Sequence, residues 1–141
     1  MLPSLHDYYL ASYEVNCEGR QIKLHARRPE CAEALGVSTT TIVFGGVEGY
    51  HFKNDAFGNI VFSLEAVSVE TLVSEYRAEI MESYRVAGAP GPWAADLPSA
   101  CQLLNTQGVK GFVISSSFGL SGWVLAKEAS VSLSEKVRPS N

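Results

Sequence analysis

One amphipathic stretch, residues 69–87, constrains the fold more than any other part of the chain. Its apolar side chains recur at intervals of three and four, which is the period of one helical face. These side chains are Leu72, Val73, Tyr76, Ile80, Tyr84 and Ala87. Ser68 before the stretch is a good N-cap, and Gly88 after it favours a left-handed stop. The pattern therefore predicts one main amphipathic helix over 69–87.

Strand-like sequence stands on both sides of this helix. Apolar and polar residues alternate with a period of two over 9–17, 21–27 and 60–64. The segment 39–44 is mostly β-branched, and 109–116 and 122–129 are predicted as two final strands. In the first of these segments the alternation gives one face to Tyr9, Ala11, Tyr13, Val15 and Cys17. Gly45-Gly46 indicates a bulge, after which 47–52 continues the third strand. We expect an antiparallel meander of about six strands packed against the helix.

The remaining segments complete the expected domain. A short second helix is predicted over 97–107, with Asp96 as its N-cap. Residues 89–93, Ala-Pro-Gly-Pro-Trp, predict an irregular connector, and 29–36 predict a surface loop or, alternatively, a helical turn over 30–35. We expect one α+β domain over 1–133, followed by a flexible polar tail over 134–141. Closure into a barrel and opening as a two-layer sandwich both fit the pattern.

Composition narrows the classes of function. A chain of 141 residues makes one domain, and its 11 basic and 15 acidic residues give a net charge of −4. This balance argues against nucleic-acid binding, which requires clustered Lys and Arg. The apolar runs are too short to span a membrane, and the first residues lack the pattern of a signal peptide. Cys17, Cys31 and Cys101 form no CxxC pair, so we expect reduced thiols and a cytoplasmic location.

The first candidate site lies on the loop after the third strand. It contains Tyr50, His51, Asn54, Asp55 and Phe57. His51 could act as an acid or base near neutral pH with Asp55 orienting it, and the aromatic residues could anchor a partner or ligand. The alternative interpretation is a polar hairpin connection whose Asn and Asp satisfy the turn backbone, with Tyr50 and Phe52 in the core.

The second candidate site is a serine-rich turn at 115–123, where Ser116, Ser117 and Ser121 could line a polar pocket. Gly119-Leu120-Ser121-Gly122 is one residue short of a nucleophile elbow, and the turn lacks the Gly-Lys-Ser/Thr of a P-loop. The alternative interpretation is an ordinary hairpin turn.

Histidine and cysteine spacing predicts neither a metal site nor a cofactor. The three histidines show no i,i+4 pair and no HExxH motif. A nucleophilic pair of Cys31 and His25 would require the fold to bring the two together, which local sequence leaves open.

The opening Leu5-His6-Asp7, followed by Tyr13-Glu14-Val15 and Ile22-Lys23-Leu24, resembles the start of small bacterial immunity-like proteins, which are associated with polymorphic toxins. The later strand Thr41-Ile42-Val43-Phe44-Gly45-Gly46-Val47 adds to this resemblance. It covers about the first third of the chain. It implies a non-catalytic protein that binds a toxin or another protein partner, and it assigns no binding residues.

Two hypotheses of function follow. The first is a non-enzymatic interaction module that binds another protein through a sheet face, a strand edge or the loop that begins at Tyr50. The second is a small-molecule-binding protein or modest hydrolase that uses His51 and Asp55 in a pocket between sheet and helix. A homodimer joined through a strand edge fits either hypothesis.

Overall fold

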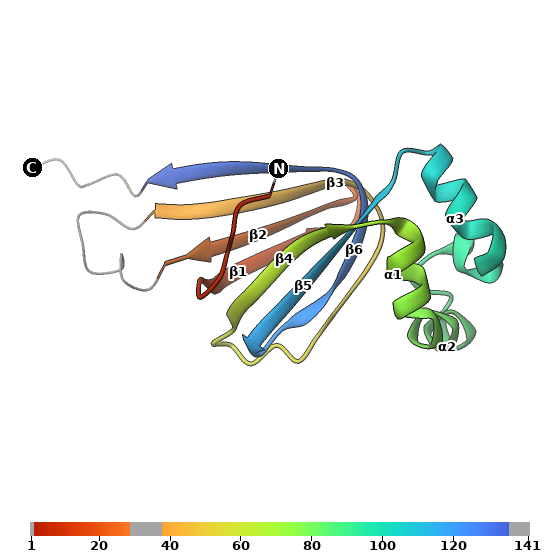
Figure 1. Ribbon diagram of the computed structural model, residues 1–141, viewed down its shortest axis with the longest axis horizontal. Coiled ribbons are helices and arrows are strands. Elements are labelled where there is room, and N and C mark those ends of the chain that lie inside the picture. Colours follow the sequence, from red (N-terminus) through yellow and green to blue (C-terminus); the bar gives the residue numbers. More distant parts are fainter. Residues whose placement is uncertain (1, 29–37, 136–141) are drawn as a thin grey trace, which may run out of the picture.

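The computed structural model describes residues 2–28 and 38–135, and in these residues six antiparallel strands close into a barrel (Figure 1). The strands are β1 (Tyr9–Asn16), β2 (Gln21–Arg27), β3 (Ser38–Lys53), β4 (Ile60–Val67), β5 (Lys110–Phe118) and β6 (Ser121–Glu135). Helices gather at one side of the barrel (Figure 1). The expected α+β class with an antiparallel sheet is confirmed. The sequence pattern fitted either a barrel or a two-layer sandwich, and the structure is a closed barrel.

The strand order departs from a simple meander. It runs β1-β2-β3-β6-β5-β4, so β3 lies beside β6 instead of β4. These are the two longest strands, and they pair from Ser38↔Glu135 to Lys53↔Ser121. Because alternation specifies a strand but not its neighbour, the sequence pattern could not reveal this pairing.

The predicted helix over 69–87 is two helices, α1 (Val69–Glu75) and α2 (Arg77–Ala87). The helical conformation is interrupted at Tyr76, whose φ is −104° and ψ 18°. A break of one residue hardly disturbs the apolar period, which explains why the stretch predicts a single helix. The caps are confirmed: the Ser68 side chain accepts a hydrogen bond from the Thr71 N–H, and Gly88 is left-handed.

The connector and the second predicted helix lie further along the chain. The connector expected to be irregular over 89–93 is not irregular throughout. A short 3₁₀ helix, η2 (Pro92–Ala95), begins within it, and proline suits the first turn of a helix. The next helix, α3 (Leu97–Thr106), agrees with the prediction over 97–107. Trp93 of η2 is buried and donates a hydrogen bond from Nε1 to the Glu48 carbonyl at 2.8 Å.

The apolar side chains form two cores, one inside the barrel and one between the barrel and its helices. Strand β6 serves both: Val124 and Ala126 lie in the barrel core, while Trp123 and Leu125 lie in the helix core. This alternation is that of a strand buried on both faces.

Strand β1 does not keep the single apolar face that its alternation predicts. Its register against β2 shifts between Leu10 and Ser12, so a bulge interrupts the alternation. As a result Leu10 is buried in the barrel, whereas Ala11 and Cys17 are exposed.

Some predictions fall outside the described residues. The expected loop over 29–36 and Cys31 lie there, as do positions 136–141 of the expected tail. Strand β6 extends to Glu135, beyond the expected domain end at 133.

Candidate functional site

The loop from β3 to β4 and the turn from β5 to β6 meet at one end of the barrel (Figure 1). Asn59 joins them, and its side chain is only 3% exposed. Its Oδ1 accepts hydrogen bonds from the Ala56 N–H at 2.9 Å and the Leu120 N–H at 2.8 Å. Gly119 is left-handed, and a Cβ there would collide with the Asn59 side chain. The structure therefore joins the second candidate site to the Asp55 end of the first one.

The Asp55 carboxylate organises the loop. It accepts hydrogen bonds from the Asn59 Nδ2, the Phe57 N–H and the Tyr13 hydroxyl, each at 2.9 Å. These three donors, Asn59 first, hold the pKa of Asp55 below its usual value. The hydrogen bond to Asp55 in turn raises the pKa of Tyr13. The hydrogen bonds of this carboxylate thus go to its own loop and to Tyr13 of β1.

Phe57 stands at the tip of this loop. Its φ is 60°, in the left-handed region that bulky residues rarely adopt, and its side chain is 97% exposed. Holding a non-glycine residue in that region destabilises the fold by about 1–2 kcal/mol. Because the ring stays in water, no burial of apolar surface offsets this cost. The loop therefore holds a large apolar side chain in a position that contributes nothing visible to the fold.

Three further apolar side chains are exposed beside this loop. Ile60 and Phe118 are register partners across β4 and β5, and Phe62 lies two residues further along β4. Their exposed fractions are 39%, 57% and 55% for Ile60, Phe118 and Phe62. We call Phe57, Ile60, Phe62 and Phe118 the phenylalanine surface. Sequence analysis singled out only Phe57 among these residues, because Ile60 and Phe62 alternate like core residues and only the barrel shows which face they occupy.

The serines of the second candidate site serve the turn itself. The Ser116 hydroxyl donates to the Leu120 carbonyl, and the Ser117 hydroxyl donates to the Ile60 carbonyl at 3.3 Å. Ser121 begins β6, opposite Lys53. Asn54 is exposed, with a left-handed φ of 65°. These polar groups shape the edge of the phenylalanine surface.

His51 and Asp55 have different partners. The His51 Nε2 lies 3.7 Å from the Glu79 Oε1 of α2, and the Lys53 Nζ lies 3.6 Å from the Glu79 Oε2. Asp55 faces Tyr13 and its own loop. Among the described residues, no hydrogen bond or ion pair joins His51 to Asp55, so the observed partner of this histidine is a carboxylate that sequence analysis did not single out.

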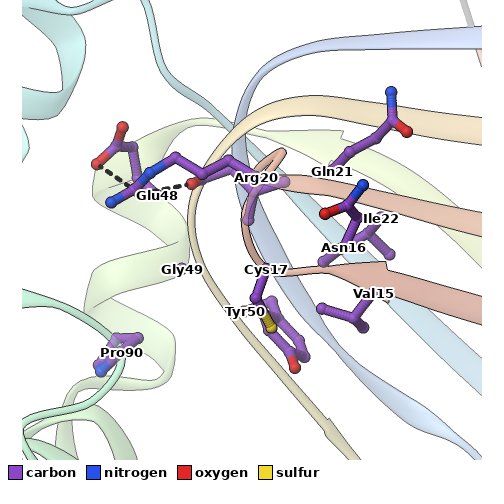
Figure 2. A pocket seen from close by; sticks show the side chains of 11 residues that line it. Val15, Asn16, Cys17, Arg20, Gln21, Ile22, Glu48, Gly49, Tyr50 and Pro90 are labelled. Carbon is purple, nitrogen blue, oxygen red and sulfur yellow. Dashed lines mark hydrogen bonds and ion pairs between the residues drawn. The ribbon is translucent and has the colours of Figure 1, made fainter.

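Tyr50 lines a cavity of about 230 Å³ between the β1–β2 hairpin and the second half of β3, with Pro90 on its border (Figure 2). Val15, Ile22 and Val47 contribute apolar lining. At the rim, the Arg20 Nη1 donates to the Val47 carbonyl at 3.1 Å and lies 3.8 Å from the Glu48 Oε1. This cavity lies apart from the predicted pocket between sheet and helix.

Within residues 2–28 and 38–135, no helix is long and apolar enough to cross a membrane. The same residues contain no group of three or more His, Cys, Asp or Glu side chains placed to hold a metal ion. Comparisons of the chain with protein-family models, curated proteins and solved structures find no match.

Proposed function

We propose that this chain is a non-enzymatic interaction module that binds another protein through the phenylalanine surface. The observation that carries the proposal is Phe57, almost fully exposed on a loop whose hydrogen bonds hold it in a left-handed conformation. Strained conformations that the surroundings enforce are concentrated at functional positions. Exposed apolar groups clustered at one place are typical of surfaces that bind partners.

The loop is suited to this role because it is ordered before binding. Asp55 and Asn59 fix its backbone with hydrogen bonds to Ala56, Phe57 and Leu120. A ring held in place loses little conformational entropy when a partner covers it. Large aromatic side chains are also the usual anchors of protein interfaces.

The alternative, a small-molecule-binding protein or hydrolase, has less support. His51 and Asp55 have separate partners, and neither residue lines the cavity beside Tyr50. The resemblance to bacterial immunity-like proteins favours a toxin, present in the same cytoplasm, as the partner.

A quantitative pull-down tests the proposal. Tagged protein is recovered from the lysate of its source cell, and bound proteins are measured by mass spectrometry against an untagged control. We expect to recover one protein near stoichiometry. Phe57→Ala or Phe118→Ala should reduce its recovery by at least about tenfold, since each removes an aromatic side chain that the bound partner would cover.

The matched control is Glu75→Ala, an exposed change on α1 away from this surface. It should retain the partner, and all variants should melt within a few degrees of the wild type. Equal recovery by Phe57→Ala, Phe118→Ala and Glu75→Ala would contradict the proposed surface. Recovery of the chain alone, with dimers in sedimentation, would indicate a homodimer.

A further inference from the structure

The second half of β3 presents a free strand edge. Strand β2 pairs with β3 only as far as Gln21↔Gly45, whereas β3 continues to Lys53 beside β6. In the part of the chain that the structure describes, no strand pairs with the other edge of this continuation. Free edges are templates for a strand from another chain.

Strand β1 borders the same gap. It pairs with β4 only at Tyr9↔Ile60, so most of its outer edge has no partner strand among the described residues. We call the gap between β1 and the second half of β3 the seam. Tyr13 bridges one end of it, because its hydroxyl reaches Asp55 and its ring meets that of Phe52 edge-on at 5.7 Å.

The other end of the seam is hollow. There the cavity of about 230 Å³ opens between Val15 of β1 and Tyr50 of β3 (Figure 2). The backbone of Val47 is bonded to Arg20, and the Glu48 carbonyl is bonded to Trp93. The edge left for a new strand therefore covers residues 49–51, between these contacts and the contact of Tyr13 with Phe52, and it lies beside the cavity.

The chemistry of the cavity indicates what it would receive. Its lining is apolar at Val15, Ile22 and Val47, and the uncharged polar groups of Asn16 and Gln21 line it as well. The charges of Arg20 and Glu48 at the rim face each other, so an incoming group need not be charged. The volume suits one large side chain better than a cofactor or a drug-sized molecule.

We propose that an extended segment of the protein partner adds a strand along β3 from Gly49 and places one uncharged apolar side chain in the cavity. Such binding takes affinity from main-chain hydrogen bonds and specificity from side-chain pockets. The inference rests on the proposed function in that the occupant is a protein. It uses a surface separate from Phe57 and its neighbours.

A peptide selection on the full chain tests this site. Random heptapeptides displayed on phage are selected against the wild-type protein, and the enriched peptide is synthesised for anisotropy titration. We expect strand-forming sequences with an uncharged apolar residue at a fixed position. Methylation of alternate backbone nitrogens in the peptide should weaken binding by about tenfold or more, since it removes the donors of strand pairing.

Two variants test the cavity itself. Val15→Trp fills it from a partly exposed position and should weaken peptide binding by about tenfold or more, because the apolar side chain loses its pocket. Ser130→Trp adds the same ring at an exposed position of β6 outside the cavity and should bind like the wild type. Thermal melting verifies that both variants are folded.

The outcomes separate this site from the proposed function. Peptide binding that survives Phe57→Ala and is lost with Val15→Trp supports the seam as a docking site. No enrichment, or binding that neither Val15→Trp nor N-methylation weakens, overturns it. Peptides that bind Val15→Trp but not Phe57→Ala would overturn the seam site and leave the phenylalanine surface as the binding region.

Discussion

The two ends of the seam between β1 and β3 are built in opposite ways. At one end, Tyr13, Asp55 and Asn59 join in hydrogen bonds that fix the loop carrying Phe57. At the other end, Val15, Ile22 and Val47 line a cavity beside Tyr50, with polar residues at its border. Satisfied polar groups give a rigid projection, whereas an unfilled apolar lining gives a recess. The seam thus has an exposed aromatic side chain that could insert into a partner at one end, and a cavity that could bind a side chain of a partner at the other.

The largest expected effect is at Trp93, which donates a hydrogen bond to the Glu48 carbonyl next to the hollow end. Trp93→Ala should reduce the free energy of unfolding by about 3–5 kcal/mol, because a buried indole is replaced by a cavity. Trp93→Phe retains a ring and loses the hydrogen bond to Glu48, for a reduction of about 1–2 kcal/mol. Urea denaturation measures both values. Equal values for the two variants would mean that the ring does not support this end.

The next effect sharpens the contrast at the bonded end. Asn59→Ala leaves the N–H groups of Ala56 and Leu120 without their acceptor and should reduce the free energy of unfolding by about 2–4 kcal/mol. Asn105→Ala, which removes an exposed amide bonded to Glu70, is the control and should lose less than about 1 kcal/mol. Similar losses in urea denaturation for both variants would contradict a special role for Asn59.

Phe57 offers a test with the opposite sign. Phe57→Gly relieves the left-handed strain and should increase the free energy of unfolding by up to about 1 kcal/mol. Phe57→Ala keeps the strain and should stay within about 0.5 kcal/mol of the wild type. Both variants should lose the partner. If Phe57→Ala unfolds the protein, the ring supports the fold and the comparison fails.

The smallest effect concerns pH. Because the pKa of Asp55 is lowered in the folded chain, its contribution to stability is present above the ordinary aspartate pKa of about 3.9 and is lost as the pH falls through the lowered value. Wild type should exceed Asp55→Asn in stability at pH 7, and the two should converge in acid. Urea titrations from pH 7 to about 2 measure the gap. A gap that grows in acid would contradict the assigned hydrogen bonds.

Local sequence predicted the strands and the helical stretches, but not the break at Tyr76, the 3₁₀ helix at Pro92–Ala95 or which strands are neighbours. Periods of two and of three to four residues identified the strands and the helical stretch at 69–87. The pairing of β3 with β6 and the closure of β1 on β4 depend on contacts between distant segments. The bulge after Leu10 also reverses the face of β1, and alternation contains no sign of it.

The candidate site divides in the same way. Turn-forming residues predicted connections at the loop around Asp55 and between the last two strands, although Ser116 and Ser117 belong to β5 and only residues 119–120 separate β5 from β6. Their union through Asn59 spans 61 positions to Leu120, so no local pattern could indicate it. Glu79 as the partner of His51 likewise depends on where α2 packs. The cavity beside Tyr50 is lined by the β1–β2 hairpin and by β3, so it depends on how the barrel brings these segments together.

Amide hydrogen exchange on the free and partner-bound protein tests the central claim most directly. The account predicts slower exchange in the complex at residues 55–62 and 117–120, which carry and border the phenylalanine surface. Exchange at the exposed face of α2, around Glu82, should be unchanged. Protection confined to α2, with none around Phe57 and Phe118, would contradict the claim.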